Sequence, residues 1–167
     1  MDYFILKQDP DLNHTARIRS GGKMSKAASV STKVVYVEDQ LFKDYPDFYE
    51  RPGLLIAKKF KKVLGLYQPE IKFQTVVLVD KKEKHQVSYD LLQVPTVDCV
   101  SEESEFRFDK IITLVLDLQL VGDYRVFKVK GYGNQLVVRL DVAESLLRRG
   151  AYGIIFEKVK IKKQEMV

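Results

Sequence analysis

The sequence has little of the material from which reactive or metal-binding sites are built. It contains one cysteine, two histidines and no tryptophan among its 167 residues. The single cysteine, Cys99, excludes an internal disulfide framework and fits a reducing compartment. Two histidines without a cysteine pair do not form a zinc-binding pattern. We therefore expect a cytoplasmic protein with no metal and no cofactor.

Long hydrophobic runs are also lacking. The N-terminal stretch MDYFILKQDP has an acid at position 2 and only four consecutive apolar residues. It fits neither a signal peptide nor a membrane span. Hydrophobic residues make up 46% of the chain and charged residues 31%, which is typical of a globular protein. The length predicts a single domain over residues 1–167 that buries roughly 70% of its unfolded surface.

Charges of the two signs are segregated along the chain, although the net charge is only +5. Residues 86–123 carry 2 basic and 8 acidic side chains. The flanking stretches are basic, with 8 basic and 3 acidic residues in 53–85 and 10 and 4 in 124–167. A basic total alone would suggest nucleic acid as a partner. The acidic stretch between two basic ones favours instead a protein with two differently charged faces.

One strand–helix–strand pattern occurs twice. Residues 136–140 (LVVRL) predict a strand, 141–149 a short helix and 153–161 another strand. Residues 53–79 repeat that order, with a lysine-rich helix between two apolar runs. Neither unit carries a phosphate loop, a metal cluster or a nucleophile. The two units are therefore expected to be equivalent parts of a scaffold.

The helix of the first unit is predicted from spacing. Phe60, Val63, Leu64 and Tyr67 fall at i, i+3, i+4 and i+7, which gives one apolar face. The opposite face carries Lys58, Lys59, Lys61 and Lys62. These lysines, with Arg148 and Arg149, could bind phosphates. A solvated helix face is favoured, because Phe60 and Tyr67 point inward and leave no surface aromatics for base stacking.

The second helix has start and stop signals. Asp141 and Glu144 fit a D-x-x-E capping box, and Gly150 stands where a C′ glycine belongs. Its expected buried stripe is Val142, Ala143, Leu146 and Leu147.

The remaining elements are mostly strands. Residues 111–118 are predicted as a strand, with a short helix as the alternative, and 11–32 as a long loop. The other predicted strands are 2–8, 34–38, 71–79, 86–92, 124–130 and 135–140. Turns at 80–85 and 131–134 predict two hairpins. The expected fold is α+β, a mixed, largely antiparallel sheet with two short packed helices.

No candidate for catalysis or ion binding has a family signature. Gly21-Gly22-Lys23 lacks the first glycine of a phosphate loop. Cys99 could act as a nucleophile with His14 or His85 as base, but buried cysteines are commonly plain apolar residues. The acidic cluster of Glu102, Glu103 and Glu105 with Asp98 lacks the spacing of a calcium loop. It is interpreted as a solvated loop or an acidic contact surface for a protein partner.

Several stretches together resemble a known bacterial family. They are MDYFILKQDP, KKFKKVLGLYQPEIKFQTVVLVD, VDCVSEESEF and VVRLDVAESLLRRGAYGI. The chain, over about residues 1–9 and 34–160, is similar to the eleventh immunity family of polymorphic toxin systems, formerly a domain of unknown function. The resemblance implies a non-enzymatic protein that binds and neutralises a cognate toxin. It implies no active-site residues, and Ala57 stands where the family often has a serine cap.

Residues 42–52 are the predicted docking segment for such a toxin. They concentrate aromatic side chains between prolines, and recognition residues commonly lie on loops of a rigid scaffold. The acidic cluster would add steering toward a basic toxin surface. The predicted partner-binding residues are Tyr45, Asp47, Tyr49, Glu102, Glu103 and Glu105. Two alternatives stay open: Phe42 and Phe48 could be core residues, and the basic helix faces could serve a nucleic-acid-binding or regulatory module.

Overall fold

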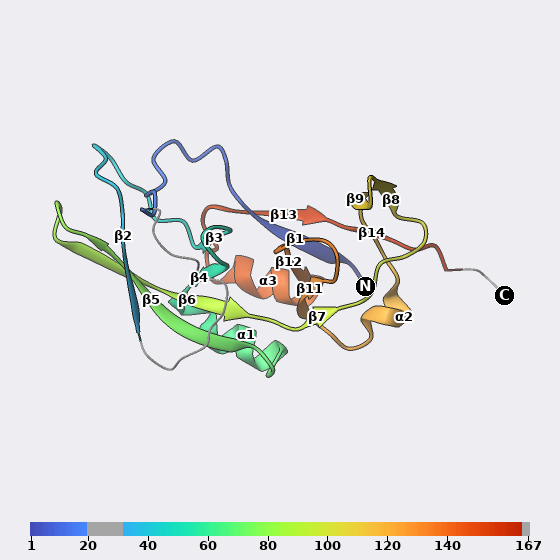
Figure 1. Ribbon diagram of the computed structural model, residues 1–167. Helices are drawn as coiled ribbons and strands as arrows, with labels where there is room; N and C mark the ends of the chain where they lie inside the picture. The colour runs from blue at the N-terminus through green and yellow to red at the C-terminus, as the bar shows by residue number, and fades with distance from the viewer. Residues whose placement is uncertain (20–31, 165–167) are drawn as a thin grey trace.

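The computed structural model describes residues 1–19 and 32–164, and it confirms the expected α+β class with far more strand than helix (Figure 1). Most strand pairs are antiparallel, but the strands form two five-stranded sheets where one was expected. The first sheet has the order β2 (Lys33–Tyr36), β5 (Lys72–Asp80), β6 (His85–Gln93), β4 (Leu55–Ala57) and β3 (Phe48–Tyr49). The second has the order β13 (Ile154–Lys158), β1 (Tyr3–Gln8), β12 (Leu136–Arg139), β11 (Val126–Val129) and β7 (Thr96–Val97).

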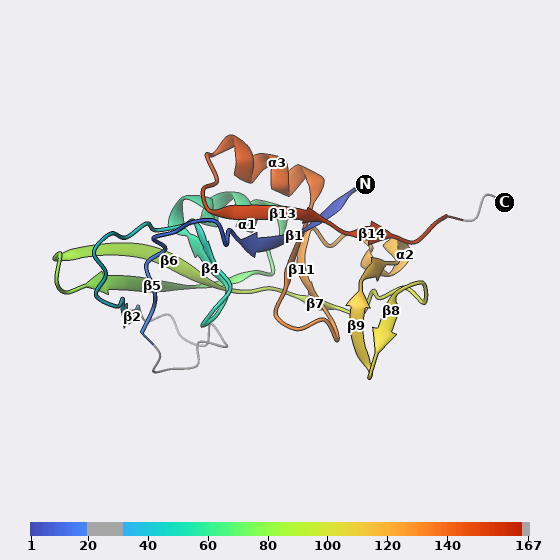
Figure 2. The same ribbon diagram turned by 90° about the horizontal axis from the view of Figure 1, so that it is seen from above.

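The helices are short and owe their stability to packing. They are η1 (Lys58–Phe60), α1 (Lys61–Tyr67), α2 (Leu118–Val121) and α3 (Leu140–Arg148). Figure 2 shows α1 and α3 on the same side of the sheets. Phe60, Leu64, Val142 and Leu146 are fully buried in one core with residues of both sheets. Each such side chain contributes roughly 1.5–3 kcal/mol, more than the propensity of such short helices supplies.

The two strand–helix–strand units have the same topology. In the first, β4 and β5 flank the antiparallel strand β6; in the second, β12 and β13 flank β1 in the same way. Each unit also begins with an antiparallel pair, β3–β4 or β11–β12. The first unit gains a parallel outer strand, because β2 pairs with β5. In the second, β10 (Val115–Leu116) pairs in parallel with β14 (Lys160–Ile161), which follows β13 along the chain, but these two strands form a separate two-stranded sheet. The two halves therefore share the order of their main strands, and β1 supplies the strand between β12 and β13 in the second.

Three local predictions are corrected. The stretch 111–118 is neither one strand nor one helix, because β9 (Lys110–Thr113) and β10 are separate strands. Asp117 follows β10 and caps α2 by accepting a hydrogen bond of 3.0 Å from the Gln119 amide. The expected capping box of α3 is absent, since Asp141 lies inside the first turn and binds Arg139 instead. The long loop is partly structured, because 11–19 makes bridges to 37 and 44, while 20–31 lies outside the described residues.

The predicted stop signal of α3 is confirmed, although Leu147, expected in the buried stripe, is 55% exposed. Gly150 has φ of +73°. Its amide donates to the Leu147 carbonyl at 3.0 Å, and the Ala151 amide donates to the Leu146 carbonyl at 3.2 Å. These two bonds form a Schellman motif, and the glycine avoids the steric cost of the left-handed backbone.

Candidate protein-binding site

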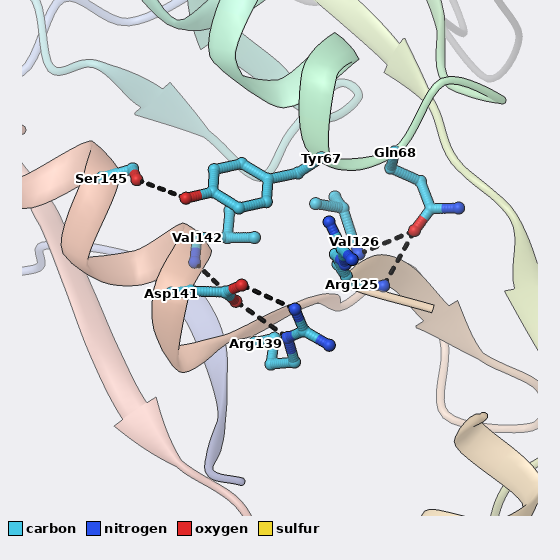
Figure 3. Close-up of polar contacts among 8 residues, drawn as sticks. All are labelled: Tyr67, Gln68, Arg125, Val126, Arg139, Asp141, Val142 and Ser145. Atoms are coloured by element: carbon cyan, nitrogen blue, oxygen red, sulfur yellow. Dashed lines mark hydrogen bonds and ion pairs between the residues drawn. The ribbon is translucent and has the colours of Figure 1, made fainter. Parts of the chain in front are cut away.

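Polar groups join the two halves where the end of α1 meets the start of β11 (Figure 3). The Gln68 Oε1 atom accepts hydrogen bonds from the Arg125 and Val126 amides at 2.8 and 3.2 Å. Tyr67 and Ser145 share a hydroxyl–hydroxyl hydrogen bond of 2.9 Å between α1 and α3. Because Gln68 is buried and satisfied by the backbone, this cluster is a structural seam between the halves.

A second seam lies where the loop after α3 meets the start of β3. The Tyr152 amide donates to Asp47 Oδ2 at 2.7 Å, and the Asp47 amide donates to the Tyr152 carbonyl at 2.8 Å. Lys59 adds an ion pair to Asp47 at 2.9 Å and donates to the Gly150 carbonyl at 3.2 Å. The two seams are equivalent in topology, since each joins the loop after one half's helix to the first strand of the other half's β–β pair.

The expectation that Asp47 and Tyr49 form an exposed docking segment is wrong. Tyr49 is 3% exposed, and its hydroxyl donates to the Ala16 carbonyl at 2.7 Å. Burial raises the pKa of this phenol above its ordinary value. Phe48 is fully buried, because β3 pairs with β4 over the core. Tyr45 is half-buried against the His85 ring. The alternative that Phe42 and Phe48 are core residues is therefore correct for the buried Phe48 and wrong for the exposed Phe42.

Most cations of the basic helix faces are engaged within the protein. Lys58 forms an ion pair with Asp90 at 3.1 Å and donates to the Thr75 hydroxyl at 2.6 Å. Lys59 binds Asp47, as described above, and Lys61 lies 5.6 Å from the centre of the Phe73 ring. Arg148 pairs with Glu144 at 3.7 Å, and Arg149 donates to the Ser145 carbonyl at 3.0 Å. These contacts leave fewer free cations for phosphate binding than the sequence suggested.

The predicted acidic cluster is exposed, but basic residues of the C-terminal strand lie beside it. Glu102 forms an ion pair of 2.7 Å with Lys162, whose hydrogen bond lowers the pKa of the Glu102 carboxyl. Glu103 and Glu105 line a shallow depression together with Lys160 and Lys163. The charge segregation seen along the chain is therefore not maintained in space at this end of the molecule.

The strongest surface feature is a hairpin that sequence reasoning missed. Strands β8 (Glu105–Arg107) and β9 pair antiparallel and project from one end of the molecule, opposite the end formed by the β5–β6 hairpin (Figures 1 and 2). Phe108 at the tip is 88% exposed, and Phe106 and Ile112 are 55% and 54% exposed. Three large apolar side chains in water within one short hairpin are characteristic of a protein contact surface.

The turn of this hairpin adopts a strained backbone. Phe108 and Asp109 have φ of +51° and +62°, so both central residues lie in the left-handed region. A two-residue turn of this kind normally uses Asn or Gly, and a phenylalanine there costs about 1–3 kcal/mol. The Phe108 side chain at this position is exposed and belongs to none of the hydrophobic clusters of the described residues. An isolated protein gains nothing from this strain.

The described residues do not assemble the candidate chemistry. Cys99 is fully buried, and burial raises the pKa of its thiol to about 11. It makes no hydrogen bond to a histidine of the described chain, and His14 and His85 instead lie against Phe42 and Tyr45. No group of three potential metal ligands occurs within 1–19 and 32–164. A membrane-spanning helix is likewise missing from these two segments.

Neither a known family model nor a curated protein matches this chain. The resemblance to immunity proteins therefore stays a prediction from the sequence.

Proposed function

We propose that this protein is a non-enzymatic binding protein that neutralises a cognate bacterial toxin and contacts it through the β8–β9 hairpin. The observation that carries the proposal is the Phe108 side chain, an aromatic ring held in water at the tip of a strained turn. Aromatic anchors of this kind supply a large share of the energy in protein interfaces. The sequence resemblance supplies the class of partner.

The proposal is tested with the protein encoded by the neighbouring gene, because the family that this chain resembles is implied to neutralise a toxin encoded alongside it. We expect the purified chain to bind that protein and to protect cells that express it. Phe108→Ala should weaken binding by at least about 2 kcal/mol, the threshold of an interface hot spot. Its melting temperature should not fall, because the ring is exposed and packs against no core residue.

Leu41→Ala is the matched control, since Leu41 is equally exposed at 87% but lies outside the hairpin. It should leave both binding and stability unchanged. A wild-type protein that neither binds nor protects would refute the proposal.

A further inference from the structure

Three features that oppose folding stability coincide in the β8–β9 hairpin. Large apolar side chains are exposed, a phenylalanine occupies a left-handed backbone position, and two like charges face each other across the strands. The like charges are Arg107 and Lys110, a directly opposed pair, which is an unfavourable arrangement in an antiparallel ladder. Local conflicts of this kind mark residues selected for contact with something outside the chain.

The two cations have no ion-pair partner among the described residues. The guanidinium carbon of Arg107 lies 5.8 Å from the centre of the neighbouring Phe108 ring. Strand alternation places Ile112 on the same face as Lys110, so this face combines positive charge with apolar surface. The complementary surface would have an apolar recess for Phe108 with carboxylates at its rim.

We infer that the hairpin docks into an apolar pocket rimmed by carboxylates on a partner protein, with Phe108 inside the pocket and Arg107 and Lys110 on its rim. This inference rests on the proposed function. It gives the contact surface of this chain a positive charge, whereas the sequence predicted that an acidic cluster would meet a basic toxin. A protein is favoured over a phosphate-rich membrane or nucleic acid. Asp109 at the tip and Glu105 at the base would repel a continuous anionic surface, whereas single carboxylates can be placed beside the two cations.

Charge reversal at Arg107 is expected to weaken binding to the partner without lowering the stability of the fold. Arg107→Glu places a glutamate opposite Lys110, so the repulsive pair becomes attractive. With the protein encoded by the neighbouring gene as probe, we expect calorimetry to show about a tenfold or greater loss of affinity. The melting temperature should stay equal to that of the wild type or rise. A residue with a merely structural role would not weaken binding while the fold is maintained.

Lys72→Glu is the control for net charge, since Lys72 is an exposed cation at the start of β5 without a partner among the described residues. It should leave the affinity unchanged. Arg107→Glu binding as tightly as the wild type would overturn the inference but not the proposed function, whereas a wild-type protein that does not bind overturns both. Sedimentation with phosphatidylserine vesicles that depends on Phe108 would also overturn the assignment to a protein partner.

Discussion

The Asp47 carboxylate accepts a 2.7 Å hydrogen bond from the Tyr152 amide, which joins the strand pair of one half to the loop after the other half's helix. The Asp47 side chain is 13% exposed, and the Lys59 ammonium lies 2.9 Å away. Asp47→Ala removes both the charged acceptor of the partly buried Tyr152 amide and the ion-pair partner of Lys59. We expect it to lower the free energy of unfolding by about 2–3 kcal/mol in urea titrations.

Asp47→Asn is the informative control for this seam. It retains an oxygen for the Tyr152 amide and removes only the ion pair with Lys59, whose side chain is 45% exposed. The loss should be about 1 kcal/mol or less. Equal losses for Ala and Asn would mean that the ion pair, and not the hydrogen bond, stabilises the seam.

Gly153, in the same seam, has no room for a side chain. A Cβ atom there would lie 2.5 Å from Pro46 Cβ, and φ is +72°. Gly153→Ala should lower the free energy of unfolding by at least about 2 kcal/mol. Gly133→Ala is the matched control, with φ of +68° but no atom within 4 Å of the added carbon, and should cost about 1 kcal/mol. Similar costs would show that the backbone conformation, and not the close approach, limits this position.

Lys43 and Asp80 form an ion pair between side chains that are only 6% and 3% exposed. The hydrogen bond from Lys43 lowers the pKa of the Asp80 carboxyl below its ordinary value of 3.8. The pair therefore stabilises the fold fully above pH 3.8, and this contribution is lost as the pH falls through the lowered pKa. Thermal melts of Asp80→Asn should show lower stability than the wild type at pH 7 and a smaller further loss on acidification below pH 4. Parallel pH profiles for the two proteins would contradict this assignment.

The Tyr49 hydroxyl joins β3 to the N-terminal segment through its hydrogen bond to the Ala16 carbonyl. Tyr49→Phe removes the donor to the Ala16 carbonyl, which is itself buried, and should cost about 1–3 kcal/mol of unfolding free energy. Tyr45→Phe should be nearly neutral, because its hydroxyl makes no hydrogen bond with a described residue. Toxin binding should be unchanged in both variants. A Tyr49→Phe protein that is fully stable but binds poorly would restore the docking segment predicted from the sequence.

The sequence predicted those parts of the fold that depend on neighbours along the chain. The spacing of Phe60 and Leu64 indicated α1, and Gly150 indicated the end of α3, because both signals act within a few residues. The β5–β6 and β11–β12 hairpins were confirmed for the same reason. The separation into two sheets was not predictable, since it depends on the pairing of β1 with β12 and β13, far apart in sequence.

Most of the candidate site could not be predicted from the sequence, because it also depends on contacts between distant residues. Prolines near Tyr49 suggested a surface loop, but β3 is a short buried strand whose partner is specified by tertiary contacts. The β8–β9 hairpin lacks the Asn-Gly or Asp-Gly turn that signals a tight connection. The alternation of Phe106, Arg107 and Phe108 was the available signal, and the acidic residues around it led to an interpretation as a charged connection.

The position of β1 between β12 and β13 in the second sheet affects the order in which a nascent chain can fold. β1 is synthesised before the first sheet, yet its two partners, β12 and β13, are synthesised after the whole of that sheet. Until then Ile5 and Leu6, which are 5% and 1% exposed in the finished protein, have no strands to cover them. The first half can form its sheet cotranslationally, whereas the second closes only when β12 and β13 emerge and pair with a strand that was synthesised before the first half.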